Sequence, residues 1–93
     1  NFKSNNDDIL KNELKNTLHK FLNKLKSLNN WNENDIQDCI KNFISQENIK
    51  IPEFAKPVRH ILTNDKDGIS LHLIIYILGI ELTNKRLNNY INN

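Results

Sequence analysis

The sequence has no methionine, a single cysteine, and only two glycines and two prolines among 93 residues. A lone thiol cannot close an internal disulfide, which favours a reducing compartment. A membrane-spanning helix needs about 18 consecutive apolar residues, and none are present, because Tyr76 and Gly79 interrupt the longest apolar run, residues 73–80. The chain opens without Met or an apolar leader, so we expect a segment of a longer protein with no targeting peptide in view.

Charge is nearly balanced, with 13 Lys and Arg against 11 Asp and Glu and a net charge of +2. Dedicated nucleic-acid-binding domains are usually more basic, so net charge alone does not predict such a partner. Hydrophobic residues make up 38% of the chain, enough for one modest core and a single domain over residues 1–93. Asn, Ile, Lys and Leu are abundant, as an A+T-rich coding sequence produces, and we discount Lys and Asn as functional signals.

Apolar residues recur at three- and four-residue steps between residues 9 and 28, which predicts one long amphipathic helix. Asp7 and Asp8 suit its N-terminus, where carboxylates meet the positive end of the helix dipole, and we expect residues 1–6 to fray. The lysines of this stretch lie largely off the apolar face. For them we favour a solvated helix face over a phosphate-facing surface.

A second amphipathic helix is predicted after Trp31, ending near residues 46–48. Asn32 is its candidate N-cap, with Glu33 and Asp35 in the first turn. Trp31 stands where a hydrophobic staple residue would, so we expect it to pack in the core rather than stack on a base.

Pro52 suits the first turn of a third helix. Pro57 lacks the amide hydrogen that the helix needs, so we expect a bend there and a fresh helical turn as far as Thr63. The polar run NDKDG at residues 64–68 is typical of a turn.

Residues 71–78 are apolar on nearly all sides, which predicts the central buried helix, with Ser70 or Asp67 as its cap and Gly79 at its end. A short final helix is predicted over residues 83–91. The expected fold is therefore an all-α, compact bundle of about five helices.

The chain contains histidines and a cysteine, but their spacing does not match a metal site or a catalytic site. His19, His60, His72 and Cys39 show no metal-ligand spacing, and there is no glycine-rich phosphate loop. Cys39 flanks the apolar stripe of the second helix, where a small buried hydrophobe is the default. We predict no catalytic residue, no metal and no cofactor in this stretch.

The order and spacing of motifs from residue 57 to the chain end resemble the C-terminal end of bacterial-type glutamyl-tRNA synthetases. That family has a P-L-R-x-A-L-T-G segment, a variable loop, an apolar helix ending in L-G-K-E, and a closing R-L. The matching residues here are Pro57-Val58-Arg59, Leu62-Thr63, Leu71, Leu78-Gly79 with Glu81, and Arg86-Leu87. The likeness extends over roughly residues 15 to 93, although the specific motifs fall in the last 40 or so.

The resemblance implies an α-helical cage that binds the anticodon, as the C-terminal subdomain of a longer synthetase. It implies RNA contacts by Arg59 and by the residues after the loop, which are Gly68, Ile69, Ser70, Leu71 and His72. A guanidinium can both hydrogen-bond and stack on an unpaired base, and His72 could stack likewise.

The chain also departs from the family pattern. Asn64 stands where the family has Gly, and Asn tolerates the left-handed backbone that a Gly would adopt. Ile69 and Ser70 stand where the family has Pro-Gly, from which we expect altered or relaxed recognition of the first anticodon base.

The resemblance further implies tRNA as partner, a parent enzyme that uses ATP and Mg²⁺, and a monomer that binds neither DNA nor membranes. The expected location is the cytoplasm of an A+T-rich bacterium, with an organelle interior as the alternative. Two other interpretations stay open: Arg59 could form a surface ion pair with Asp65 or Asp67, and the domain could be a small protein-interaction module built on the leucine-rich first helix.

Overall fold

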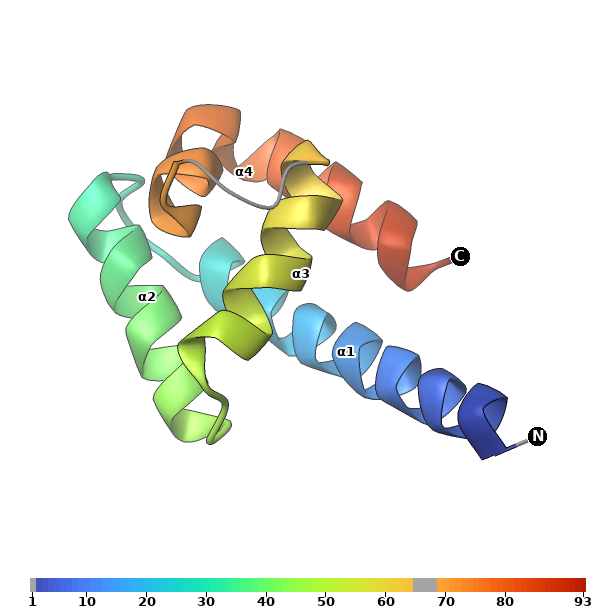
Figure 1. The fold of residues 1–93 in the computed structure, drawn as a ribbon. Coiled ribbons are helices and arrows are strands. Elements are labelled where there is room, and N and C mark those ends of the chain that lie inside the picture. Colours follow the sequence, from blue (N-terminus) through green and yellow to red (C-terminus); the bar gives the residue numbers. More distant parts are fainter. Residues whose placement is uncertain (1, 65–68) are drawn as a thin grey trace.

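The computed structural model describes the backbone of residues 2–64 and 69–93 and the side chains of residues 12–64 and 69–93. Over this part of the chain the fold is four α-helices without strands (Figure 1). They are α1 (Phe2–Lys26), α2 (Glu33–Gln46), α3 (Ile51–Thr63) and α4 (Leu71–Ile91). The predicted all-α class is confirmed.

The predicted count of about five helices is wrong by one, because the two helices expected over residues 71–78 and 83–91 form the single helix α4. Gly79 has φ 80° and ψ 165°, a non-helical conformation inside the helix. Gly79 therefore marks the predicted interruption, but the chain kinks there and resumes the helix at once instead of opening into a loop.

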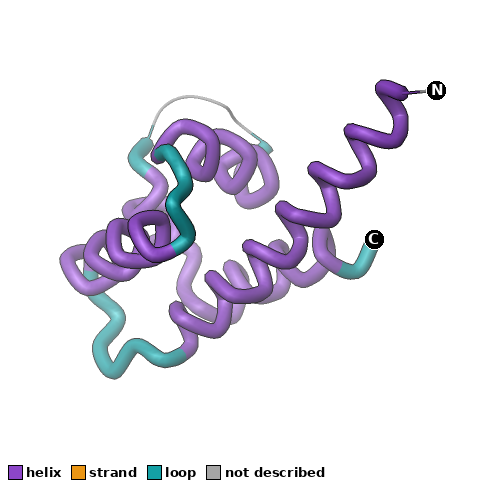
Figure 2. The backbone as a smooth tube through the Cα atoms, turned by 90° about the horizontal axis from the view of Figure 1, so that it is seen from below, coloured by secondary structure: helices purple, strands orange, loops and turns teal. Residues whose placement is uncertain are grey.

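Helix α4 packs against each of the other three helices, so it joins the bundle together (Figures 1 and 2). The buried core draws on all four helices: Leu18, Phe21, Leu22, Leu25, Ile36, Phe43, Ile44, Phe54, Val58, Leu62, Leu71, Ile74, Ile75 and Leu87. Trp31 packs against this core, as predicted, and its indole Nε1 donates a hydrogen bond to the Tyr76 carbonyl at 3.3 Å.

The prediction that residues 71–78 form the central buried helix is wrong about the burial of one face. Leu71, Ile74 and Ile75 are buried, whereas Tyr76 is 40% and Ile77 is 67% exposed. This half of α4 lies at the edge of the bundle in Figure 1, so one of its faces has no helix of the bundle over it. Composition alone cannot distinguish such an edge helix from a central one.

The starts of α1 and α2 show one difference from the prediction and one agreement with it. Helix α2 begins as predicted, because the Asn32 side chain accepts a hydrogen bond from the Asp35 amide at 2.8 Å. Helix α1 begins at Phe2, before the predicted start at Asp7 and Asp8, since no proline or glycine intervenes to stop it.

Helix α3 runs through Pro57 in one piece instead of restarting there. Pro57 has no amide hydrogen to donate to the Glu53 carbonyl one turn earlier. Glu53 lies in the exposed first turn of α3, so water can satisfy that carbonyl and the helix continues to Thr63.

We predict that Gly79→Ala destabilises the fold by about 1–3 kcal/mol, because backbone near φ 80° and ψ 165° is essentially restricted to glycine. No atom lies within 4 Å of the position that a Cβ would take, so the cost would come from the backbone and not from a clash. Urea unfolding measures it as a lower midpoint with an unchanged m-value. Asn23→Ala, on the exposed surface of α1, is the control and should leave the midpoint nearly unchanged. Equal midpoints for Gly79→Ala and wild type would contradict the assigned backbone conformation.

Candidate functional site

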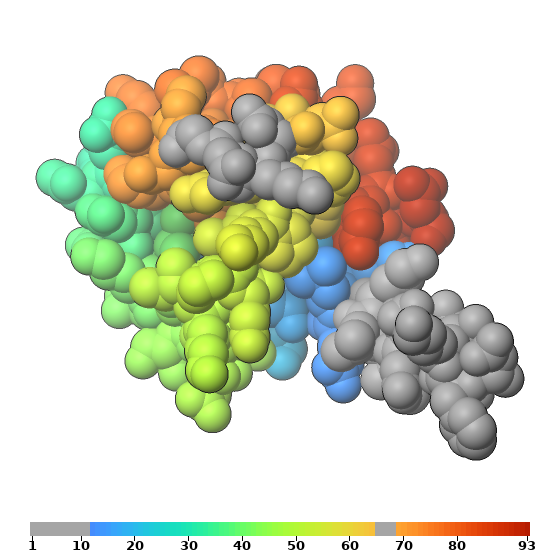
Figure 3. Space-filling view, in the orientation of Figure 1, coloured from blue at the N-terminus to red at the C-terminus, as the bar shows by residue number. Residues whose placement is uncertain are grey.

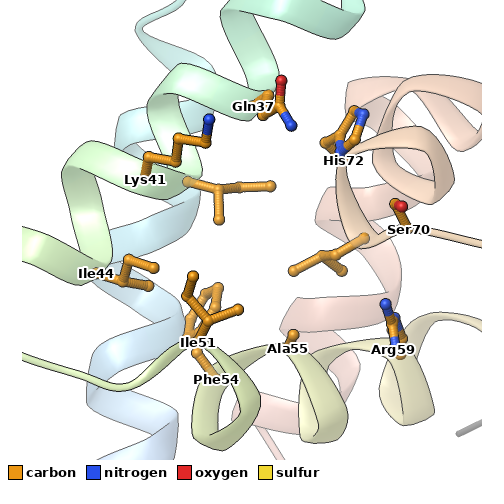
Figure 4. Close-up of a pocket in the computed structure, with 11 residues that line it drawn as sticks. Gln37, Lys41, Ile44, Ile51, Phe54, Ala55, Arg59, Ser70 and His72 are labelled. Atoms are coloured by element: carbon orange, nitrogen blue, oxygen red, sulfur yellow. The ribbon is translucent and has the colours of Figure 1, made fainter.

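A pocket of about 230 Å³ lies between α2, α3 and the start of α4 (Figure 4). Its lining combines apolar residues with polar side chains: Gln37, Ile40, Lys41, Ile44, Ile51, Phe54, Ala55, Arg59, Ser70, Leu71 and His72. The apolar part can hold the face of a flat, uncharged ring, while the polar part can hydrogen-bond the ring's edge.

Four of the six site residues predicted from the sequence come together at this pocket, namely Arg59, Ser70, Leu71 and His72. Ile69 does not line it and is 54% exposed beside Ser70. Gly68 lies outside the described residues. Arg59 of α3 therefore lies beside the first turn of α4, at one wall of the same pocket.

The position of Arg59 follows from the burial of its neighbours on α3. Phe54, Val58 and Leu62 are buried at 2%, 0% and 1% exposure and fix one face of the helix against the core. Arg59 is one residue along from Val58, so its Cα is rotated by about 100° from that face, and the residue is half-buried. The core thus aims this side chain at the pocket edge (Figure 4).

Two contacts hold the last turn of α3. Asn64 adopts the left-handed conformation with φ 60° and ψ 24°, as predicted for a residue in place of Gly, and its amide donates to the His60 carbonyl at 2.8 Å. Arg86 of α4 donates from Nη1 to the Leu62 carbonyl. Both contacts satisfy groups at the C-terminal end of α3, the end that carries Arg59. The alternative ion pairs of Arg59 with Asp65 or Asp67 involve residues outside the described part.

The first turn of α4 places Ser70, Leu71 and His72. Ser70 occupies the N-cap position, and its carbonyl accepts the amides of Leu73 at 3.0 Å and Ile74 at 3.1 Å. The Ser70 hydroxyl makes no capping bond within the described structure, so it is available at the pocket wall. Leu71 is 6% exposed and ties this turn to the core.

The opposite wall comes from α2 and was missed from the sequence. Gln37 and Lys41 line it together with Ile40 and Ile44. These positions are spaced i, i+3, i+4 and i+7, so they share one face of the helix. That mixed polar and apolar face was the available signal, and its position opposite Arg59 becomes visible only in the fold.

The described residues that line the pocket carry positive charge. Lys41 and Arg59 line it, and none of the described lining residues is acidic. Such a surface favours a ligand that carries negative charge or hydrogen-bond acceptors.

Two of the α1 lysines are engaged within the protein. Lys15 Nζ donates to the Asn93 carbonyl at 2.6 Å, and Lys20 Nζ lies 3.3 Å from Glu47 Oε1. These contacts tie α1 to the chain end and to the end of α2. The sequence predicts a solvated face for these lysines, whereas Lys15 and Lys20 also contact other parts of the domain at its surface.

No group of three or more potential metal ligands occurs among the described residues. None of the described helices is both long and apolar enough to cross a membrane.

Comparison with known proteins places the chain beside tRNA ligases. The family model for the anticodon binding domain matches residues 1–91. Glutamate–tRNA ligase 1 of Helicobacter pylori (strain G27) is 33% identical over 76 residues, which are 82% of this chain and 16% of the relative. Glutamate–tRNA ligase 1 of Aliarcobacter butzleri is 33% identical over 82 residues, 86% of this chain and 18% of the relative. Glutamate–tRNA ligase of Pelagibacter ubique is 28% identical over 90 residues, 97% of this chain and 19% of the relative.

The chain therefore spans less than a fifth of the length of these curated relatives. No solved structure matches it.

Cys39 provides a pH-dependent prediction outside the pocket. Burial raises the pKa of its thiol, and the nearby Lys24 offsets only part of the increase. The folded state therefore favours the protonated thiol. Its contribution to the free energy of unfolding is fully present below the ordinary thiol pKa of about 8.5, and it is lost as pH rises through the raised pKa of the folded protein.

Alkylation of Cys39 by iodoacetamide should therefore reach its half-maximal rate at higher pH in the folded protein than in the urea-unfolded protein. Lys24→Gln should shift the folded profile further upward, because it removes the cation that favours the thiolate. Identical folded and unfolded profiles would show that burial does not control this thiol.

Proposed function

This chain belongs to the anticodon-binding domain family, and we propose that it binds unpaired bases of a tRNA anticodon loop as one domain of a glutamate–tRNA ligase. The observation that carries the proposal is the pocket that unites Arg59 with the first turn of α4. The glutamate–tRNA ligases that match most of the chain support the assignment to this enzyme class.

The lining of the pocket suits single-stranded RNA. Unpaired loop bases expose both a flat face and a hydrogen-bonding edge. Phe54, Ala55 and Leu71 provide an apolar surface for the face, and the planar guanidinium of Arg59 can stack on a base or donate to its edge.

The volume of the pocket favours a small ligand group. Pockets for drug-sized molecules have volumes of about 300–1,000 Å³. At about 230 Å³ this pocket lies below that range, which suits one ring system turned out of the loop.

The chemical step belongs elsewhere in the proposed enzyme. The chain spans less than a fifth of the length of its relatives, so most of such an enzyme lies outside it. In our proposal this domain positions the tRNA, while ATP, Mg²⁺ and glutamate react at a separate catalytic domain. The enzyme acts as a monomer in the cytoplasm, where tRNA is charged.

The protein-interaction alternative has less support. It requires the leucine-rich face of α1 to be open to a partner, but Leu18, Leu22 and Leu25 are at most 2% exposed. From Leu18 to Leu25 that face is already covered by the domain's own core, so this part of it offers no partner groove.

We predict that Arg59→Ala weakens binding of the cognate tRNA by about 1–3 kcal/mol, or about 5- to 150-fold, because a base loses a stacked, charged donor. Binding is measured by fluorescence anisotropy and stability by thermal unfolding. Lys56→Ala, an exposed lysine on α3 outside the pocket lining, is the matched control and should change affinity much less. The site assignment fails if Arg59→Ala binds like the control, or if its loss of affinity follows a loss of folded protein.

A further inference from the structure

We propose that α2 completes the binding site, with Gln37 reading the edge of the base held in the pocket and Lys41 binding the phosphate beside it. This inference rests on the proposed function and extends it. The predicted site residues all lie on or after α3, whereas Gln37 and Lys41 approach the same pocket from a helix that ends before α3 begins.

The two sides of the pocket face each other. In Figure 4, Gln37 and His72 lie across from one another at one end, with Gln37 on α2 and His72 on the first turn of α4. Lys41 lies on the α2 side and Arg59 on the far side (Figure 4). A ring inserted over Phe54 would therefore meet polar groups from both directions.

Gln37 has the chemistry for reading a base edge. Arg and Lys side chains only donate hydrogen bonds, whereas the Gln amide both donates and accepts. The pairing edge of every base carries donors and acceptors together, so a Gln amide can match it with two bonds. Gln37 is half-buried, and its amide bonds no other described residue, so its hydrogen-bonding groups are available to a ligand.

Lys41 has the chemistry for a phosphate. It is exposed, and its flexible stem ends in a compact point charge that suits a phosphate better than a directional base edge. Lys20 is paired with Glu47 and Lys15 with the Asn93 carbonyl, but Lys41 has no such contact among the described residues. Its position in the pocket lining sets it within reach of the backbone of a nucleotide whose base enters the pocket.

The two roles predict different effects of mutation: loss of base discrimination for Gln37 and a weaker salt dependence for Lys41. Both can be tested in the full-length protein as encoded. Wild type and the variants Gln37→Ala, Gln37→Asn and Lys41→Ala are titrated with the cognate tRNA and with tRNAs substituted at each anticodon position. Each titration is repeated over a range of salt concentrations. Gln46→Ala, at the exposed end of α2, and Lys85→Ala, on the exposed surface of α4, are matched controls.

For Lys41→Ala we expect weaker binding of all the tRNAs by a similar factor. The slope of log K against log salt should fall by about 0.7, the value for one phosphate contact on a single strand. For Gln37→Ala we expect an unchanged salt slope and a loss of about 5- to 150-fold in discrimination at one anticodon position only. Gln37→Asn, which keeps the amide but shortens its reach, should lose part of that discrimination.

The inference is overturned if Gln37→Ala weakens all tRNAs equally, or if Lys41→Ala leaves the salt slope unchanged. If both behave like their controls while Arg59→Ala weakens binding, the α2 roles are wrong and the proposed function stands. If wild type shows no saturable binding that depends on the anticodon, the proposed function fails and the α2 roles fail with it. Both side chains lie off the core, so thermal unfolding should show all variants folded.

Discussion

The contact on which the site depends is the packing of Phe54 against two other phenylalanine rings. Its centroid lies 5.0 Å from that of Phe21 on α1 and 5.7 Å from that of Phe43 on α2, and Phe21 and Phe43 are 5.3 Å apart. Phe54 is 2% exposed and also lines the pocket, so the core and the pocket share one side chain. Because cores pack at nearly fixed density, this cluster sets the distance between α2 and α3. A pocket wall fixed by the core in this way needs little ordering on binding, which lowers the cost of binding.

The positive charge that the proposed function uses lies at the pocket and not in the net charge of the domain. A net charge of +2 gives little long-range attraction for RNA, and part of the lysine content of α1 is used to hold helices together. Lys41 and Arg59 instead stand on opposite sides of one apolar pocket. In the proposed function, the affinity of this domain for tRNA comes from a few side chains that contact particular bases. General attraction for tRNA is left to other surfaces.

The helices around the pocket pack closely. Figure 3 shows α2, α3 and the start of α4 forming one continuous face.

Sequence reasoning succeeded where the signal is local. The Asn32 cap, the left-handed Asn64 and the interruption at Gly79 are each set by one or two residues, and the structure shows all three. It failed where the outcome depends on neighbours distant in sequence. The exposure of Ile77 depends on which side of α4 meets the bundle, and the contribution of Gln37 depends on α2 facing α3 across the pocket. Arg59, Ser70, Leu71 and His72 were predicted as one site only because a family motif relates them, since the residues alone left Arg59 open between an RNA contact and a surface ion pair.

The central claim is that tRNA enters the pocket between α2 and the α3–α4 junction. Isoleucine methyl NMR spectra of the full-length protein, recorded with and without cognate tRNA, test it most directly, because isoleucines occur both in the pocket lining and on the exposed surface outside it. The account predicts that the methyl signals of Ile40, Ile44 and Ile51, which line the pocket, shift on tRNA addition, while that of the exposed Ile77 stays in place. Shifts at Ile77 with unchanged signals from the three pocket isoleucines would contradict it and place the RNA on another face.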